Sequence, residues 1–358
     1  MPYLTHPDSL TELLPNEPRF RGDQLRDWLY RKPVLDTAGM TNLPAPVRNS
    51  LANRLWPFDV EADLTADAGT TKKWLFRAPD SAAYEAVLMG YPRRVTLCIS
   101  SQAGCALGCT FCATGQFGFE RHLHEGEIYA QVAYAAAYLR RHGLPGSPSR
   151  LSNVVFMGMG EPLANYPRVR EALRRMIEVQ GMSARSLTVS TVGVVPGIMR
   201  LAEEPWPVRL AVSLHAADDE LRSTLVPLNQ RYPIEALIQA AEAYFSAKGR
   251  RVSLEWTLMD GVNDMADQAI KLARIALRLG AHINLIAMNP TPLSDDRPSA
   301  PGQIAEFMSI LQKKGANATL RHMRGQTIDA ACGQLRVSAG GGSTSSRKTT
   351  TVPMPRRR

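Results

Sequence analysis

Three cysteines lie within eight residues of one another and form the pattern in this sequence that most directly suggests chemistry. Their spacing is Cys105-x3-Cys109-x2-Cys112. Deprotonated thiols are soft ligands, which suit zinc or the iron of an iron–sulfur cluster. The first hypothesis is therefore a metal centre held by this segment.

The kind of metal centre depends on where a fourth ligand comes from. Structural zinc usually takes four ligands in two close pairs, and no second close pair of cysteines follows in this sequence. Zinc would need Cys98, His122 or His124 as its fourth ligand. Three thiolates on a [4Fe-4S] cluster instead leave one iron open to bind a substrate. The pattern favours this open cluster, with a zinc site and three buried cysteines without metal as the alternatives.

The elements that position these cysteines alternate between apolar and amphipathic segments. Apolar runs predict strands at 93–100, 153–157, 186–190, 209–213, 252–258 and 283–287. Helical periodicity predicts helices at 127–140, 169–179, 196–203, 234–248, 268–279 and 303–313. About six such βα units predict an α/β fold, an incomplete parallel (β/α)6 barrel over 91–336.

Polar residues gather directly beyond the C-terminal ends of these predicted strands. The cysteine segment follows the first strand, and the other strands are followed by Gly160 and Glu161, Ser190, Ser213 to His215, and Asn289. In parallel α/β folds this rim is where binding and catalytic residues are assembled. We therefore expect the site at this rim.

Two accessory segments precede the barrel and one follows it. Residues 1–56 read as a helical module in which Phe20, Leu25, Trp28 and Leu29 share one face, and this module either docks RNA or packs as a cap. Residues 57–90 read as a short β extension. Residues 337–358 are rich in glycine, serine, threonine and proline and are predicted to be a disordered basic tail.

Composition and charge exclude several classes of protein. The 358 residues are 44% hydrophobic and 21% charged, as in a globular chain, and no apolar run reaches the length of a membrane span. The N-terminus has no signal-peptide pattern, so a cytoplasmic location is expected. The net charge of +9 suggests a polyanionic partner, although removing the five cations of the tail leaves only +4.

Longer blocks around these residues resemble the RlmN family of radical S-adenosylmethionine (SAM) methyltransferases. The C-x3-C-x2-C pattern on its own is typical of the whole radical SAM superfamily. The blocks specific to the family are TLCISSQAGCALGCTFCATG, NVVFMGMGEPLANY, LTVSTVG, SLHAADDELR, NLIAMNP and RGQTIDAACGQL. The resemblance covers about residues 20–335. It implies methylation of carbon 2 of adenosine in 23S ribosomal RNA, near the peptidyl-transferase region, and in transfer RNA, next to the anticodon.

The resemblance also implies cofactors and the residues that hold them. Cys105, Cys109 and Cys112 would hold a [4Fe-4S] cluster whose fourth iron is open to SAM. The implied SAM contacts are Gly160, Glu161, Ser190, Ser213, Leu214, His215 and Asn289. A glycine lets backbone approach a ligand, and the Glu161 carboxylate suits the amino group of SAM.

Three further residues would carry the chemistry in such an enzyme. The resemblance makes Cys332 the methyl carrier, as an S-methylcysteine, and Cys98 the thiol that later pairs with it in a transient disulfide. Glu85 matches the proton acceptor, although it stands in YEA where the family usually has VET, and Met288 stands where an aromatic residue is usual. Two SAM molecules would be used in each turnover.

The resemblance implies three partners: 23S rRNA, tRNA and a low-potential electron donor such as flavodoxin. It implies no association with a membrane. Two alternatives remain. A Cfr-type enzyme would methylate carbon 8 of the same adenosine, but that branch tends to have alanine where this chain has Pro162. A non-catalytic RNA-binding protein with a zinc-stabilised loop is the other.

Overall fold

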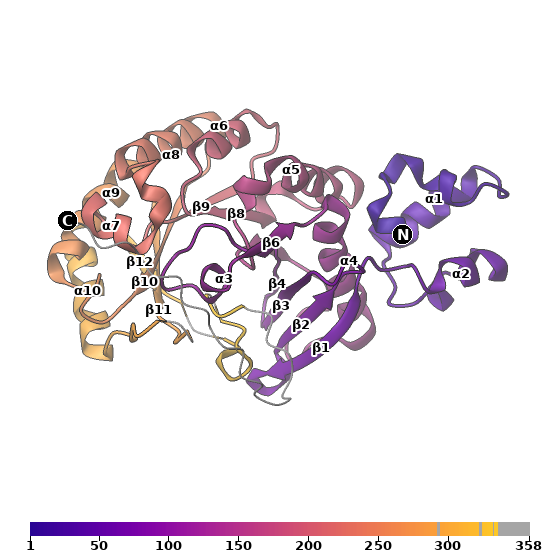
Figure 1. Cartoon of the computed structure of the whole chain (residues 1–358), viewed down its shortest axis with the longest axis horizontal. Helices are drawn as coiled ribbons and strands as arrows, with labels where there is room; N and C mark the ends of the chain where they lie inside the picture. Colours follow the sequence, from indigo (N-terminus) through magenta and orange to yellow (C-terminus); the bar gives the residue numbers. More distant parts are fainter. Residues whose placement is uncertain (292–293, 322–323, 332, 336–358) are drawn as a thin grey trace, which may run out of the picture.

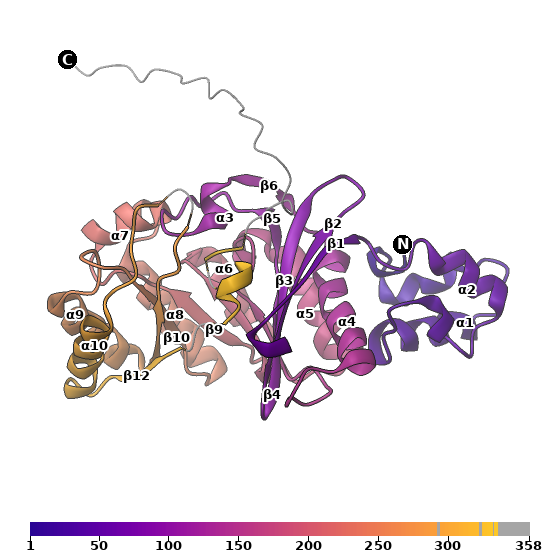
Figure 2. The same ribbon diagram turned by 90° about the horizontal axis from the view of Figure 1, so that it is seen from below.

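The central feature of the fold is a ten-stranded sheet with the strand order β1-β2-β3-β4-β7-β8-β9-β10-β11-β12. The computed structural model describes residues 1–291, 294–321, 324–331 and 333–335. Cys332 and the predicted tail at 337–358 lie outside the described residues. Helices cover the outer face of the sheet (Figures 1 and 2).

Seven neighbouring strands of this sheet run parallel to one another. They are β4 (Arg94–Cys98), β7 (Asn153–Phe156), β8 (Leu187–Thr191), β9 (Arg209–Ser213), β10 (Ser253–Leu258), β11 (His282–Ala287) and β12 (Asn317–Leu320). The α/β fold with a parallel core is thus confirmed, and all six predicted strands are present. β12 was not predicted, because it has only four residues and most of them are exposed.

Alternation along β8 shows how the strands position polar groups. Leu187 and Val189 are fully buried in the hydrophobic core, whereas Thr188 and Ser190 line cavities. Because successive side chains of a strand point to opposite faces, one face of this strand packs in the core while the other supplies the site.

The helices follow the predicted periodicity closely. They are α4 (Glu125–His142), α5 (Tyr166–Arg174), α6 (Val195–Glu203), α8 (Ile234–Lys248), α9 (Ala266–Leu279) and α10 (Pro301–Lys313). The short helices α3 (Ala113–Gln116) and α7 (Asp219–Leu225) were not predicted. Among the residues that the structure describes, no helix has both the length and the hydrophobicity that a membrane crossing requires.

Three antiparallel strands extend the sheet beyond β4. They are β1 (Asp59–Ala66), β2 (Thr71–Arg77) and β3 (Ala83–Tyr91), and β3 pairs with β4 so that Val87 lies opposite Cys98. Aromatic side chains of this extension pack against α4: the ring centroids of Trp74 and Tyr134 are 5.3 Å apart. A separate two-stranded hairpin, β5 (Gln102–Gly104) with β6 (Phe119–His122), flanks the cysteine segment.

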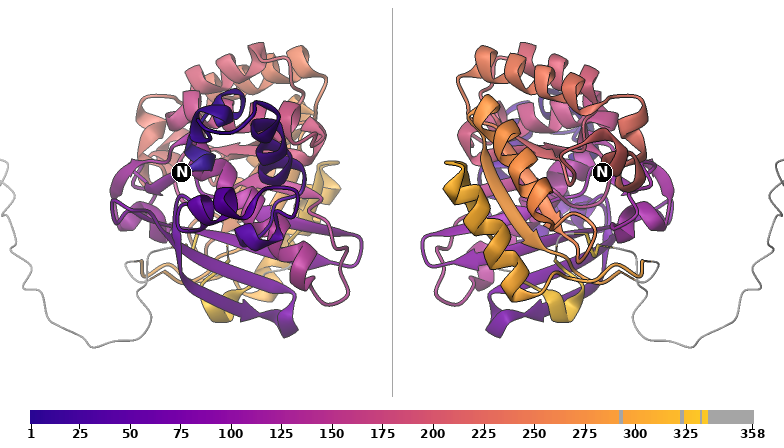
Figure 3. Two further views of the ribbon diagram at one scale, coloured as in Figure 1. Left: turned by 90° about the vertical axis from the view of Figure 1, so that its right-hand side faces the viewer. Right: turned by 90° about the vertical axis from the view of Figure 1, so that its left-hand side faces the viewer.

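The N-terminal helices form a module at one end of the molecule (Figures 1 and 3). Its longer helices are α1 (Phe20–Arg26), which continues as a wider π turn over Asp27–Arg31, and α2 (Ala45–Ala52). Leu25 and Leu29 are fully buried, as their shared face predicts, but Phe20 is 51% exposed. The prediction that Phe20 shares this face is wrong, because five residues at about 100° each place it roughly 140° around the helix from Leu25.

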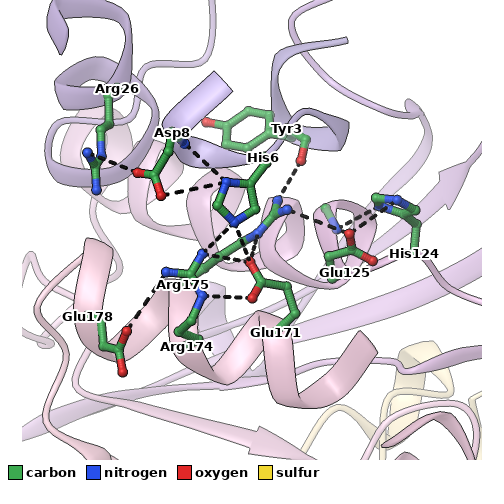
Figure 4. Close-up of polar contacts among 11 residues, drawn as sticks. Tyr3, His6, Asp8, Arg26, His124, Glu125, Glu171, Arg174, Arg175 and Glu178 are labelled. Atoms are coloured by element: carbon green, nitrogen blue, oxygen red, sulfur yellow. Dashed lines mark hydrogen bonds and ion pairs between the residues drawn. The ribbon is translucent and has the colours of Figure 1, made fainter. Parts of the chain in front are cut away.

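Arg175 lies at the contact between this module and the barrel (Figure 4). Its guanidinium donates to the carbonyl of Tyr3 at 2.8 Å and to the carboxylate of Glu171 at 3.0 Å. Glu125, at the start of α4, lies 3.7 Å away. The Arg175 side chain is only 1% exposed, so this ion-pair network joins the first residues of the chain to α4 and α5.

Candidate active site

The three clustered cysteines line one cavity of about 150 Å³ at the C-terminal ends of the parallel strands. The segment that carries them is closed by the hairpin: the Cys105 amide donates to the carbonyl of Gly118 at 2.8 Å. Gly104 has a φ of +74°, and a Cβ there would lie 2.1 Å from that carbonyl oxygen. Only glycine therefore allows this turn.

The cysteine segment is also held by the C-terminal part of the chain. The Ala113 amide donates to the carbonyl of Gly333 at 2.8 Å, and the Thr114 hydroxyl donates to the carbonyl of Leu335 at 2.6 Å. Gly333 directly follows Cys332 in the sequence. These bonds bring the segment around Cys332 to the cysteine segment, a proximity that a separation of 221 positions between Thr114 and Leu335 does not reveal.

Glu161 and Gly160 form the wall of the cavity that follows β7. The buried Glu161 carboxylate accepts hydrogen bonds from the amides of Leu163 and Val192, both at 2.9 Å. Burial raises the pKa of Glu161 to about 7, and these two amides oppose the shift. Gly160 has a φ of +94°, and a Cβ there would lie 2.4 Å from the side chain of Gln102. A cationic ligand would favour the ionised form of Glu161.

His215 contributes a neutral imidazole to the same cavity. Its Nδ1 accepts the Thr257 amide at 3.0 Å, and burial, with a smaller effect of Arg222, lowers the pKa of the ring to about 3. A neutral imidazole has one donor and one acceptor nitrogen, so its proton is on Nε2. His215 also has a φ of +59°, a left-handed conformation that is uncommon outside glycine.

The remaining predicted SAM contacts divide into two groups. Ser190, Ser213 and Asn289 line the cavity, and the Ser190 and Ser213 hydroxyls are 3.4 Å apart. Leu214 does not line it, because its side chain packs in the hydrophobic core. Any contact of Leu214 with a ligand in this cavity would have to come from its backbone.

The three thiol donors of the first cavity have the soft ligand chemistry that an iron–sulfur cluster requires. No three histidine, cysteine or carboxylate side chains of the described residues converge closely enough to hold one metal ion. His124 instead caps α4, and His122 contacts Gln102 in the hairpin. Burial, reinforced by the neighbouring Cys112, raises the pKa of Cys105 to about 12 and also raises the pKa of Cys109. Bound iron would reverse this, because a coordinating thiol is deprotonated.

Cys98 lines a second cavity, of about 650 Å³, inside the barrel. Ala330 and Ala331, which precede Cys332, line it as well. The second cavity shares Met157, Ile286 and Asn289 with the first. Cys98 and the residues next to Cys332 thus face one space that adjoins the space of the three clustered cysteines.

Glu85 lies beside these cavities without lining either of them. It is 1% exposed, and its carboxylate lies 3.1 Å from the ammonium of Lys73. The same ammonium donates to the carbonyl of Asp329 at 3.2 Å. Lys73 therefore links Glu85 to the segment that leads to Cys332.

Sequence reasoning missed Glu255, a buried carboxylate that lines the first cavity. Its Oε1 accepts from Asn284 at 2.8 Å and lies 3.6 Å from Arg321, whereas its Oε2 has no hydrogen-bond partner among the described residues. The signal was available: Glu255 is the one charged residue in the apolar run VSLEWTL.

Comparison with known proteins agrees with this geometry. Residues 99–273 match the radical SAM superfamily, and residues 10–56 match the ribosomal RNA large subunit methyltransferase N-terminal domain. The chain is 50% identical over 333 residues to the probable dual-specificity RNA methyltransferase RlmN of Frankia alni, covering 91% of this chain and 80% of that protein. The chain belongs to the RlmN family.

Other RlmN relatives and a solved structure extend this finding. The RlmN protein of Thermobifida fusca is 48% identical, with 92% of each chain covered. A crystal structure of a radical SAM methyltransferase from Sphaerobacter thermophilus is 46% identical, with a TM-score of 0.88 over 94% of this chain and 99% of that one. The protein is accordingly a radical SAM enzyme of the dual-specificity RNA methyltransferase family.

Proposed function

We propose that this RlmN-family enzyme methylates carbon 2 of adenosine in 23S rRNA and in tRNA, with Cys332 as the methyl carrier. The observation that supports the proposal best is the shared second cavity. Cys98 and the residues flanking Cys332 line it, and it adjoins the cavity of the three clustered cysteines. Two thiols with separate tasks at one substrate would need such a space.

In this proposal Cys105, Cys109 and Cys112 hold a [4Fe-4S] cluster, and the surrounding residues hold SAM. When bound together, the cluster and SAM supply a 5′-deoxyadenosyl radical. Gly160 leaves room for the ligand, and Glu161 retains lone pairs for its amino group. His215 offers the Nε2 proton as a donor, and Ser190, Ser213 and Asn289 offer further hydrogen-bonding groups on the same wall.

In this proposal Cys332, Glu85 and Cys98 each carry out a different step in the transfer of the methyl group. The Cys332 thiolate takes a methyl group from SAM by displacement, and loss of one hydrogen atom from that methyl lets its carbon bond to carbon 2 of adenine. Glu85 accepts the ring proton, and the unpaired electron that the addition leaves on the adduct passes to a one-electron acceptor, for which the oxidised cluster would serve. The Cys98 thiolate attacks the sulfur of Cys332, so the S–S bond forms and the S–C bond breaks. The carbon keeps the electron pair and takes a proton, and an external reductant later opens the disulfide.

The two cysteines can be separated experimentally because they would fail at different steps. Cys98→Ala should accumulate protein covalently linked to RNA, seen as a nuclease-sensitive shift on a denaturing gel. Cys332→Ala should bind cluster and RNA without any adduct. Normal turnover by Cys98→Ala would overturn the two-thiol mechanism. Mass spectrometry of the nucleosides made by the wild type tests carbon 2 directly, and a methyl on carbon 8 would favour the Cfr-type alternative.

A further inference from the structure

The second cavity is lined by an unusual number of positive charges. No aspartate or glutamate of the described residues lines it. Four arginines do: Arg94, Arg209, Arg321 and Arg324. The interior of a parallel barrel is ordinarily filled by layers of branched apolar side chains. Here the interior is an open cavity that combines apolar side chains with four cationic ones, and the unbalanced positive charge favours an anionic ligand.

The four arginines differ in how far the protein itself neutralises them. Arg321 lies 3.6 Å from the buried carboxylate of Glu255. Arg324 donates to the hydroxyl of Thr70 at 2.9 Å. Neither Arg94 nor Arg209 forms an ion pair with a described residue, and both are exposed to the cavity or solvent. Their charges are therefore available to a ligand.

Tyr91 orients part of this set. The guanidinium of Arg94 lies 4.5 Å from the centroid of the Tyr91 ring, and that of Arg324 lies 4.3 Å from it. Stacking on an aromatic ring fixes the plane of a guanidinium while leaving its N–H groups free to donate. Such a preorganised fork matches two oxygens of a phosphate.

The positions of Arg94 and Arg209 along their strands show how far these arginines lie from the cysteines. Arg94 opens β4 and Cys98 ends it, so four residue steps separate them, roughly 13 Å along the strand. Arg209 opens β9, which is three strands away from β4 in the sheet. Both unpaired arginines thus stand at the N-terminal ends of the strands, on the side opposite the cysteine segment.

We propose that Arg94 and Arg209, assisted by Arg324, bind backbone phosphates of the RNA segment that flanks the target nucleoside. This inference rests on the proposed function, because it places the modified base near Cys98. A cavity of about 650 Å³ lies in the range of sites that enclose a small ligand and admits an unstacked nucleotide. RNA enters from the N-terminal side of the strands, while the cofactor residues occupy the C-terminal side.

The test compares RNA binding by variants that lose charge inside and outside the cavity. The double variant Arg94→Gln/Arg209→Gln is measured against Arg274→Gln, whose arginine is exposed on α9, on the outside of the barrel. The dissociation constant for unmodified tRNA is determined at several salt concentrations. Each phosphate that the protein no longer neutralises lowers the slope of log affinity against log salt by about 0.7–0.9, so the slope of the double variant should fall by about 1.5.

Turnover gives a second reading of the same variants. The KM for RNA should rise at least tenfold in the double variant, while RNA-independent SAM cleavage and iron content stay at the wild-type level. Arg94→Lys/Arg209→Lys keeps the charge and should retain most of the salt slope. A salt slope unchanged from wild type, or changed no more than in Arg274→Gln, would overturn the inference. Failure of the proposed function would give a different result: the wild-type protein would bind RNA but would make no 2-methyladenosine.

Discussion

The four cysteines that the structure describes lie in two different cavities, and this difference gives each group a separate expected phenotype. Cys105, Cys109 and Cys112 share the first cavity, where no other described thiol is present to replace one of them. Substituting any one by alanine should therefore abolish iron–sulfur absorption and SAM cleavage together. Cys98→Ala is the matched control and should keep both, because Cys98 lines the other cavity. Full iron content in a Cys109→Ala protein would contradict the cluster assignment.

Hydrogen-bonding residues on the cavity wall should affect SAM without affecting iron. Ser190→Ala or Asn289→Ala removes a group that we assign to the ligand, which should cost about 1–3 kcal/mol of binding free energy. Calorimetric titration of the cluster-loaded protein measures this directly. Ser186→Ala makes the same chemical change just before β8, where the hydroxyl bonds only the Ser183 carbonyl, and should leave the affinity unchanged. If Ser190→Ala and Ser186→Ala bind SAM equally well, Ser190 is not a contact.

The buried pair of Lys73 and Glu85 should matter for stability as well as for chemistry. Both side chains are at most 3% exposed, and removing one partner of a buried pair costs about 3–5 kcal/mol. Lys73→Met should therefore lower the free energy of unfolding in urea by about that amount. The double variant Lys73→Met/Glu85→Leu should recover stability but not methylation, because it restores an uncharged core while removing the proton acceptor. Lys271→Met, at an exposed ion pair with Asp218, is the control and should change stability little.

At the scale of elements, the turn between β1 and β2 holds the segment that leads to Cys332. The Asp67 carboxylate accepts from the Thr71 hydroxyl at 2.6 Å and from the Gly325 amide at 2.9 Å. Asp67→Ala removes both bonds and also places alanine at a φ of +52°, which alanine tolerates poorly. Hydrogen exchange of a peptide covering 324–335 should become faster, and methylation should fall while SAM cleavage without RNA persists. Asp67→Asn keeps an acceptor and should behave nearly as wild type; equal protection in all three proteins would refute this role.

How far the sequence determines each element depends on whether its interactions are local. Helices such as α8 matched their predicted bounds because periodicity and a C-terminal glycine, Gly249, are local signals. The rim position of Glu161, Ser190 and His215 was also predictable, since parallel strands share one C-terminal edge. The link from Lys73 to Asp329 was not, because 256 residues separate them. The arginine lining of the second cavity was hidden for the same reason: Arg94 and Arg209 open two strands that are not neighbours in the sheet, and the other two arginines follow β12.

At the scale of the whole molecule, the N-terminal module is joined to the barrel through a charged contact that a single substitution can test. Arg175→Met would remove the bond to the Tyr3 carbonyl and leave Glu171 and Glu125 without their shared cation. Because the arginine is buried, we expect a loss of about 3 kcal/mol in unfolding free energy, with faster proteolysis of residues 1–56.

The same substitution separates RNA binding from cofactor chemistry. Residues 10–56 match a ribosomal RNA methyltransferase N-terminal domain, so a loosened module should raise the KM for RNA while RNA-independent SAM cleavage stays unchanged. Arg170→Met is the matched control: this α5 arginine pairs with Glu204, outside the module, and is 46% exposed, so its loss should leave the module docked. A wild-type protease pattern and KM in Arg175→Met would mean that apolar packing around Tyr3, which stacks on Trp56 at 4.9 Å, holds the module without the ion pairs.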